Sequence, residues 1–230
     1  AGMTAVEADL RALRIFVRER STTVERPALS GHTRSMHLRS PAIVCASRPH
    51  GETAAIVRAL TPDHGLVAGY VAGGRGRQLR PVLIPGNSVE IDLRSKSEGQ
   101  LPFAKVELVH SRGPWLGEPL PAAAIGWITA LTTAALPERQ PYPSLYLALS
   151  ALLDAVCHAP SARGWLPGLV AYEGLLLREL GYGGAPPDPA AGMPEFDVQG
   201  TRLERYLLAD RRGDVMGARA LLRERLARMG

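Results

Sequence analysis

The most informative stretch of this chain reads Ile43-Val44-Cys45-Ala46-Ser47-Arg48-Pro49-His50-Gly51-Glu52-Thr53. It is followed by Thr61-Pro62-Asp63-His64-Gly65 and then by Gly73-Gly74-Arg75-Gly76-Arg77. Short apolar runs broken by polar turns are typical of β-strands, and here they lead into a glycine loop that carries arginines. No acid–base pair or nucleophile accompanies the stretch, whereas an enzyme normally places such groups together. The pattern therefore favours a small β-barrel that holds a polyanion over a barrel that performs chemistry.

The same alternation of apolar runs and turns continues to about residue 110. We expect strands over residues 42–47, 54–60, 66–71, 82–84, 89–93 and 103–109. Five or six short strands at this spacing predict an OB-type barrel, and an SH3-like barrel fits the same pattern.

Beyond a Pro/Gly-rich joint at residues 112–117, the apolar spacing becomes helical. We expect helices over 122–136, 144–158, 166–180, about 201–210 and 214–228, with an exposed loop at 183–200. The predicted fold class is α+β, an N-terminal OB-fold barrel at 36–112 followed by an all-helical domain at 113–230. Residues 1–35 are expected to be a disordered extension, with the true start of the protein near Met36.

The net charge of +5 is unevenly distributed along the 230 residues. Residues 36–112 carry +4, residues 1–35 carry +2 and residues 113–230 carry −1. Only two of the 27 basic residues are lysines, and the codon usage of a GC-rich genome explains that ratio without reference to function. The placement of the charge is more informative, because an excess in the barrel half predicts a phosphate backbone as its partner.

The sequence lacks the common motifs that would indicate an enzyme or a metal site. It contains no GxxxxGK[ST], GxSxG or HExxH and no CxxC pair, and its six histidines are scattered. We therefore expect no catalytic residues, no metal and no cofactor. Cys45 and Cys157 lie far apart inside apolar runs, which predicts buried thiols in a reducing, cytoplasmic compartment. No apolar run is long enough to span a bilayer, and no signal peptide is evident.

The arginine-bearing glycine loop is the best candidate for a nucleic-acid site. Its glycines let the backbone approach a ligand closely, and its arginines supply charge. A solvated hairpin tip explains the loop equally well, and Arg48 and Arg58 fit solvated strand positions as readily as contacts. The last helix, with Arg219, Arg223 and Arg225, could extend the basic surface. The residues expected to contact nucleic acid are Arg48, Arg58, Arg75, Arg77, Arg80, Arg94, Lys96 and Lys105.

The opening stretch resembles the start of the bacterial RecO family, in which a strand leads through an Arg/Pro/His–Gly–Glu turn to a second strand. Thr61-Pro62-Asp63-His64-Gly65 resembles the family's T-x-x-H-G turn, and the run from Gly73 to Asn87 resembles its basic hairpin in the shorter alphaproteobacterial form. Tyr142-Pro143-Ser144-Leu145-Tyr146 and Tyr172-Glu173-Gly174-Leu175-Leu176-Leu177-Arg178-Glu179-Leu180-Gly181-Tyr182 resemble its later helices. The resemblance covers residues 36 to about 228.

This resemblance implies a protein of recombinational repair that is not an enzyme. Such a protein would bind single- and double-stranded DNA, anneal complementary strands, and act with RecR and single-stranded-DNA-binding protein to load RecA, in the nucleoid. Many members carry a four-cysteine zinc site after the L-G-Y helix, but no cysteine follows Cys157, so zinc is expected to be absent.

Two other functions fit the residues alone. One is an OB-fold RNA-binding factor. The other is a metal-dependent nuclease, whose carboxylates at Asp63, Glu90, Asp92 and Glu98 would come from different hairpins.

Overall fold

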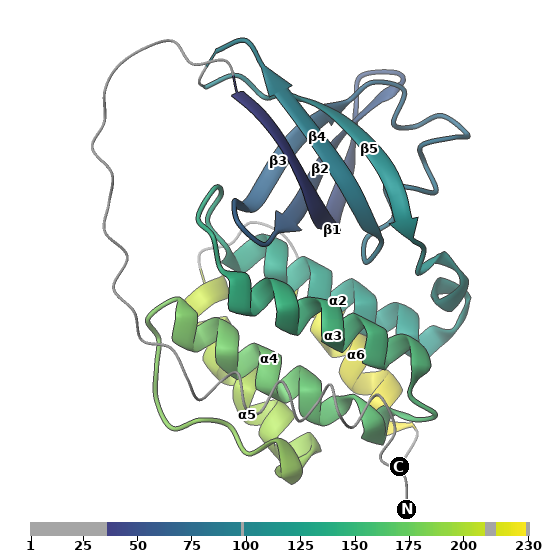
Figure 1. Cartoon of the computed structure of the whole chain (residues 1–230). Helices are drawn as coiled ribbons and strands as arrows, with labels where there is room; N and C mark the ends of the chain where they lie inside the picture. The colour runs from purple at the N-terminus through teal and green to yellow at the C-terminus, as the bar shows by residue number, and fades with distance from the viewer. Residues whose placement is uncertain (1–35, 98, 210–214, 229–230) are drawn as a thin grey trace, which may run out of the picture.

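A barrel of five strands stands on a bundle of helices (Figure 1). The structure, a computed structural model, describes residues 36–97, 99–209 and 215–228. The extension expected at residues 1–35 lies outside the described residues.

The barrel is built from β1 (Met36–His50), β2 (Ala54–Thr61), β3 (Gly65–Val71), β4 (Ser88–Ser95) and β5 (Phe103–His110). Its strands close in the order β1-β2-β3-β5-β4, with β1 paired to both β2 and β4. All pairings are antiparallel except that of β3 with β5, which meet in parallel at Tyr70 and Phe103. This closed five-stranded topology confirms the OB-type barrel.

A bulge in β1 lets this one strand serve two cores. Val44 pairs with Ala59 and Ala46 with Arg58, so Cys45 is the extra residue between them. Val44 points into the barrel interior, whereas Ile43 and Cys45 are buried against the helices. The outer face of the barrel near the bulge is therefore as apolar as its interior.

The segment at residues 72–87, which connects β3 to β4, differs from the prediction. Residues 82–84 were expected to form a strand, but they form turns, with the Leu83 amide donating to the Leu79 carbonyl. Leu83 is buried and completes the barrel core, so the apolar run plugs the barrel. Pro81 and Pro85 bound the run and cannot donate to a strand ladder, which explains why the run forms no strand.

The described residues of the second half of the chain form five longer helices and three short 3₁₀ turns. They are α2 (Pro119–Ala135), α3 (Pro143–His158), α4 (Leu166–Glu179), α5 (Met193–Leu203), which continues as the π-helical turn η4 (Glu204–Leu208), and α6 (Val215–Ala227). The 3₁₀ turns are η1 (Gly113–Gly117), η2 (Ala162–Gly164) and η3 (Pro189–Ala191).

The exposed loop expected at 183–200 is in part wrong, because α5 begins at Met193. Its Pro194 falls in the first turn, where a missing N–H costs nothing. Phe196, Gly200 and Leu203 lie on its buried face at helical spacing.

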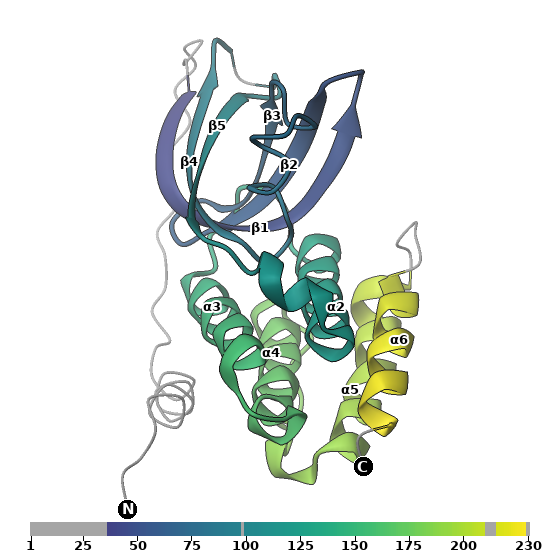
Figure 2. The ribbon, with the colours of Figure 1, turned by 90° about the vertical axis from the view of Figure 1, so that its right-hand side faces the viewer.

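The barrel and the helices share one buried interface. Ile43, Leu60 and Leu66 from the barrel join the core formed by α2, α3 and α4, and Figure 2 shows the barrel standing directly on α2 and α3. Arg112 strengthens this junction, because its side chain is 1% exposed and donates to the Gly86 carbonyl, to Ser88 Oγ at 3.0 Å and to Asp154 of α3. This buried arginine thus contacts both halves of the molecule.

A second buried arginine lies inside the bundle. Arg219 of α6 donates to Glu173 Oε2 of α4 at 2.9 Å, and its guanidinium covers the ring of Phe196 at 3.7 Å from the centroid. Trp127 Nε1 donates to the other oxygen of Glu173 at 2.8 Å. Arg219 is therefore internal, and Arg223 forms an ion pair with Asp197. The expectation that this helix extends a basic surface is wrong for Arg219.

Candidate nucleic-acid interface

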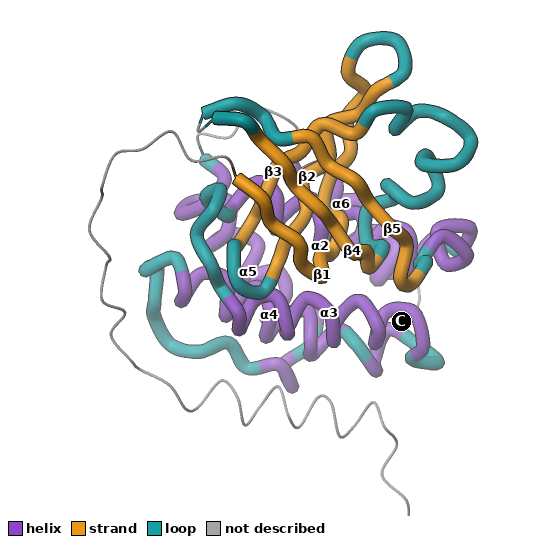
Figure 3. Tube along the Cα trace, turned by 45° about the horizontal axis from the view of Figure 1, so that its top comes forward, coloured by secondary structure: helices purple, strands orange, loops and turns teal. Residues whose placement is uncertain are grey.

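Three connections of the barrel lie at its end away from the helices. They are the β1–β2 turn at residues 51–53, the described residues of the β4–β5 loop at 96–97 and 99–102, and the first part of the 72–87 segment (Figures 1 and 3). Six of the eight residues expected to bind DNA lie on these connections or on strand ends next to them: Arg48, Arg75, Arg77, Arg80, Arg94 and Lys96. Lys105 and Arg58 lie further along β5 and β2.

Arg75 holds the 72–87 segment in place. Its Nη1 donates to the carbonyls of Gly51 at 3.0 Å and Glu52 at 2.8 Å, and its backbone amide donates to Thr53 at 2.9 Å. The preceding Gly74 lies so close to Ala55 that a Cβ at position 74 would approach the Ala55 Cβ to 2.8 Å. The glycines and Arg75 therefore dock this loop onto the β1–β2 turn.

Six basic residues at this end of the barrel are exposed, and Arg75 and Arg94 among them have side-chain partners. The other four have no side-chain hydrogen bond or ion pair within the part of the chain that the structure describes, and we call them the open cations. They are Arg48, Arg77, Arg80 and Lys96. Because no carboxylate of the described residues forms an ion pair with them, their charge is available to a phosphate backbone.

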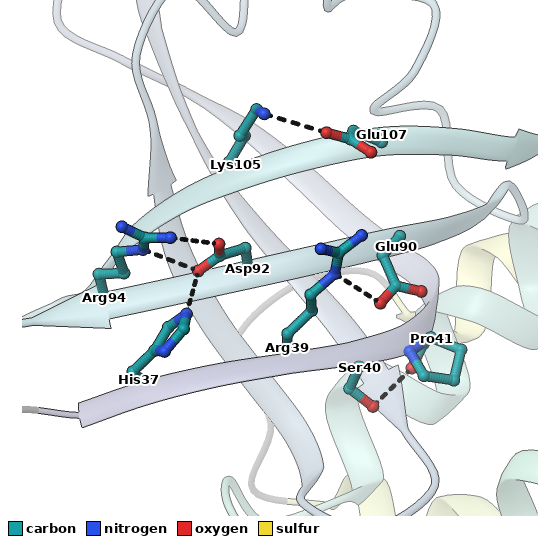
Figure 4. A network of polar contacts seen from close by, with 9 residues as sticks. All are labelled: His37, Arg39, Ser40, Pro41, Glu90, Asp92, Arg94, Lys105 and Glu107. Atoms are coloured by element: carbon teal, nitrogen blue, oxygen red, sulfur yellow. Dashed lines mark hydrogen bonds and ion pairs between the residues drawn. The ribbon is translucent and has the colours of Figure 1, made fainter.

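The outer face formed by β4, β5 and the first half of β1 (residues 36–43) is different, because there each cation has a carboxylate neighbour (Figure 4). Arg39 pairs with Glu90 at 3.2 Å, Arg94 with Asp92 at 2.9 Å and Lys105 with Glu107 at 3.0 Å. We call this surface the paired face. Its formal charges cancel, so the Arg94 and Lys105 that were expected to bind DNA lie on a neutral background.

Asp92 is the most heavily engaged carboxylate of the paired face. The two hydrogen bonds from Arg94 and the contact with His37 Nε2 at 3.1 Å hold the pKa of Asp92 below its usual value. The carboxylate therefore stays ionised and keeps neutralising Arg94 throughout the neutral range. A DNA phosphate would have to compete with Asp92 for this guanidinium.

Arg58 faces the helical half of the molecule. Its Nη1 donates to the Thr133 carbonyl at 3.2 Å and its Nη2 pairs with Glu138 at 3.2 Å. Its side chain is 29% exposed, and the guanidinium joins β2 to the end of α2. Of the eight predicted residues, Arg58 and Arg75 thus have internal contacts that account for them.

Three aromatic rings at the same end of the barrel were missed by the sequence analysis. His50, Tyr70 and Phe103 lie side by side, and Phe103 is 66% exposed. Their residues are far apart in the sequence. The antiparallel pairings of β1, β2 and β3 bring His50 near Tyr70, and the parallel pairing of β3 with β5 brings Phe103 to Tyr70. The outward alternation of Phe103, Lys105 and Glu107 along β5 was the available signal.

The remaining chemistry of the described residues is limited. Burial raises the pKa of the Cys45 thiol to about 12 and that of the Cys157 thiol to about 11, so both are protonated at neutral pH. In the part of the chain that the structure describes, no three His, Cys, Asp or Glu side chains could share a metal ion. No described helix is long and apolar enough to cross a membrane.

The molecule is thus an OB-type barrel with open cations at one end, joined to a helical bundle. The family model for the N-terminal part of recombination protein O matches residues 36–112, and the model for its C-terminal part matches residues 119–184. The chain belongs to the RecO family of DNA repair and recombination proteins.

Alphaproteobacterial relatives agree with this assignment. The chain is 41% identical over 150 residues to the DNA repair protein RecO of Phenylobacterium zucineum, covering 64% of this chain and 60% of the relative. It is 42% identical over 149 residues to that of Rhodospirillum centenum, with 64% and 58% covered, and 40% identical over 151 residues to that of Caulobacter vibrioides, with 65% and 59% covered. The matched region spans about three fifths of the length of these relatives.

Proposed function

We propose that this protein is a non-enzymatic recombination mediator that binds DNA and anneals complementary strands. On this proposal it works in the cytoplasm at the nucleoid, with RecR and single-stranded-DNA-binding protein, to load RecA onto gapped DNA. Family membership supports the role in repair. The observation that carries DNA binding is the group of open cations at one end of an OB-type barrel, on two of its connections and near the end of β1.

The physical mechanism needs no active site. Two complementary strands repel each other through their phosphates, and cations that neutralise phosphates release condensed counterions and lower that repulsion. The open cations can do this without first breaking an internal ion pair. The near-neutral helical half is better suited to contacts with protein partners than with DNA.

The nuclease alternative draws no support from the carboxylates that suggested it. Glu90 and Asp92 are engaged by Arg39 and Arg94 on the paired face, and Asp63 lies in the β2–β3 turn at the other end of the barrel. Glu98 lies outside the described residues. Incubation of DNA with the protein and Mg²⁺ should therefore leave the DNA intact.

The decisive variant is Arg77→Ala with Arg80→Ala. At about 0.1 M salt, each phosphate contact on single-stranded DNA contributes roughly fivefold in affinity, so the pair should cost about 25-fold. The slope of log K against log salt should become shallower by about 1.4. Fluorescence anisotropy across a salt series measures both quantities, and thermal unfolding verifies that the melting temperature is unchanged.

The matched control is Arg163→Ala with Arg178→Ala, which removes the same charge from exposed positions of the helical half. This control should leave both affinity and slope within experimental error. An unchanged affinity in the Arg77/Arg80 variant would reject the site. Equal losses in the two variants would show that net charge alone is responsible.

A second experiment tests annealing itself. The rate at which complementary oligonucleotides pair should rise with the protein, both bare and coated with single-stranded-DNA-binding protein. The Arg77/Arg80 variant should lose this acceleration. A preference for RNA over DNA of the same sequence in competition would favour the RNA-binding alternative instead.

A further inference from the structure

The barrel presents a row of outward-facing residues that runs across four of its strands. Arg48 of β1 pairs with Ile56 of β2, Ile56 pairs with Tyr70 of β3, and Tyr70 pairs with Phe103 of β5. Neighbouring strands are about 4.8 Å apart, so the row is about 14 Å long. It begins at an open cation and ends at an exposed aromatic ring.

The rings of Tyr70 and Phe103 in this row and the ring of the neighbouring His50 contact one another. Tyr70 and Phe103 are 5.3 Å apart at an interplanar angle of 77°, and His50 meets Tyr70 at 5.8 Å and 87°. Edge-to-face pairs of this kind are favourable arrangements for aromatic side chains. The Tyr70 amide also donates to the Pro102 carbonyl at 2.7 Å, which fixes the residue before Phe103 against β3. The orientation of the rings is therefore set before any ligand arrives.

Phe103 is exposed, whereas the residues next to it on β5 that point inward are buried. It is 66% exposed and Leu101 in the adjacent loop is 41% exposed, whereas Ala104 and Val106 of the same strand face the core. Isolated exposed apolar residues need no explanation. Phe103 is not isolated in this sense. It lies beside Tyr70 and His50 and near open cations, so aromatic rings and positive charge occur together on this surface.

Charge and position identify the occupant of this surface. The row lies between the β1–β2 turn and the β4–β5 loop, over the outer face of β2 and β3, and OB folds bind oligonucleotides at this location. Arg48 begins the row, and Lys96 lies in the β4–β5 loop that leads to Phe103. Aromatic faces flanked by cations are suited to bases with a phosphate backbone beside them.

We propose that Phe103, Tyr70 and His50 form a base-stacking platform that makes this protein prefer single-stranded over double-stranded DNA. The inference rests on the DNA binding proposed above, and it assigns a second kind of contact to the same end of the barrel. Bases in a duplex are stacked on one another and cannot reach the rings, whereas unpaired bases can. The open cations serve both forms of DNA, and the platform serves single strands.

The test replaces Phe103 with leucine, which keeps an apolar side chain and removes the ring. The full chain is titrated against oligo(dT), an abasic oligonucleotide of the same length, and a duplex. Phe103→Leu should weaken oligo(dT) binding by about tenfold, while affinities for the abasic strand and the duplex change less than about twofold. The salt slope should not change, because no phosphate contact is lost. Phe103→Trp, which keeps an aromatic ring at this position, should bind oligo(dT) as well as the wild-type protein does.

The matched control is Val109→Ala on the same strand, where the side chain is 69% exposed and lies apart from the aromatic row. It should change none of the three affinities. An equal loss on oligo(dT) and on the abasic strand, or no loss on either, would overturn the platform. Self-association of the protein that Phe103→Leu abolishes and oligo(dT) does not affect would show that this surface binds a second copy, and would also overturn it.

This result is distinguishable from failure of the proposed function. If Arg77→Ala with Arg80→Ala weakens binding while Phe103→Leu does not, DNA binding stands and the platform is rejected. If the wild-type protein binds none of the three probes, the proposed function itself is rejected.

Discussion

The helical bundle and the loop end of the barrel use arginine in opposite ways. In the bundle, Arg219 is buried between Phe196 and Glu173, and its charge is neutralised. At the loop end, Arg77 and Arg80 are exposed and have no side-chain partner among the described residues. Arginine thus stabilises the bundle through a buried ion pair, whereas at the loop end of the barrel it provides positive charge that no ion pair within the described residues neutralises. A count of arginines along the sequence does not separate these two uses.

The largest effect is expected from Arg219→Ala. Removal of one partner of a buried ion pair costs about 3–5 kcal/mol of unfolding free energy, because the other charge stays buried. DNA affinity per folded molecule should be unchanged. Chemical denaturation measures the first quantity and anisotropy the second.

The same variant should show a pH dependence. Burial raises the pKa of Glu173 and Arg219 opposes that shift, so the Ala variant raises the pKa of Glu173 further above its unfolded value. The folded state then binds more protons than the unfolded state, and stability falls as pH rises. Arg219→Ala should therefore be more destabilised at pH 8 than at pH 5. Glu173→Gln combined with Arg219→Met, which leaves no charge behind, should recover most of the loss and should lack this pH dependence.

Replacement of all four open cations by alanine should give the next largest effect. Four lost phosphate contacts correspond to a weakening on the order of several hundredfold for single-stranded DNA at about 0.1 M salt. The melting temperature should stay within about 2 °C, because none of the four side chains holds the fold. If the quadruple variant melts far below the wild type, the distinction between the two regions is wrong.

Arg75→Ala tests a residue that lies between the two uses. Its guanidinium makes hydrogen bonds to Gly51 and Glu52, so its loss should free the 72–87 segment and cost about 1–2 kcal/mol of stability. DNA affinity should fall severalfold, because Arg77 and Arg80 are no longer held in place. Hydrogen exchange of the segment, compared with that of Arg77→Ala, separates loss of docking from loss of charge.

The smallest effect is expected on the paired face. Asp92→Asn together with Glu107→Gln would release Arg94 and Lys105 from their carboxylates, and DNA affinity should rise by a few fold with a steeper salt slope. Glu179→Gln with Glu204→Gln, at exposed positions of the helical half, is the matched control for charge. An affinity that does not move relative to this control would show that DNA never approaches the paired face.

Local sequence patterns predicted most of the strands and helices, but they did not predict which of these pack against one another. Turn residues and apolar alternation located β1 to β5, and helical periodicity located α2, α3 and α4. The strand predicted at residues 82–84 was wrong. A short apolar run has the composition of a strand both when it pairs with another strand and when, as here, its side chains fill the interior of a barrel. The start of α5 was missed because Gly192 and Pro194 are turn residues that also begin helices.

The sequence indicated which basic residues could form the candidate site, and the structure showed which of them are already engaged by neighbouring groups. All eight basic residues are on the barrel, as composition and spacing suggested. Whether each charge is available depends on neighbours distant in sequence, such as Glu138 for Arg58 and the Gly51 carbonyl for Arg75. The alternation along β5 indicated only that Phe103 faces outward. It could not indicate which rings lie beside Phe103, because Tyr70 and Phe103 are separated by a long connection and meet through one parallel pairing.

The amino-acid sequence alone was sufficient for the barrel, the helical half, the RecO resemblance and the excess of positive charge near the barrel. These follow from local periodicity, turn chemistry and composition, which act over a few residues. Folding selected which arginines are open, which are paired and which are buried, and it assembled the rings of His50, Tyr70 and Phe103. Electrostatic neutralisation and ring contacts act through space, so they depend on where strands and helices meet rather than on their order in the chain.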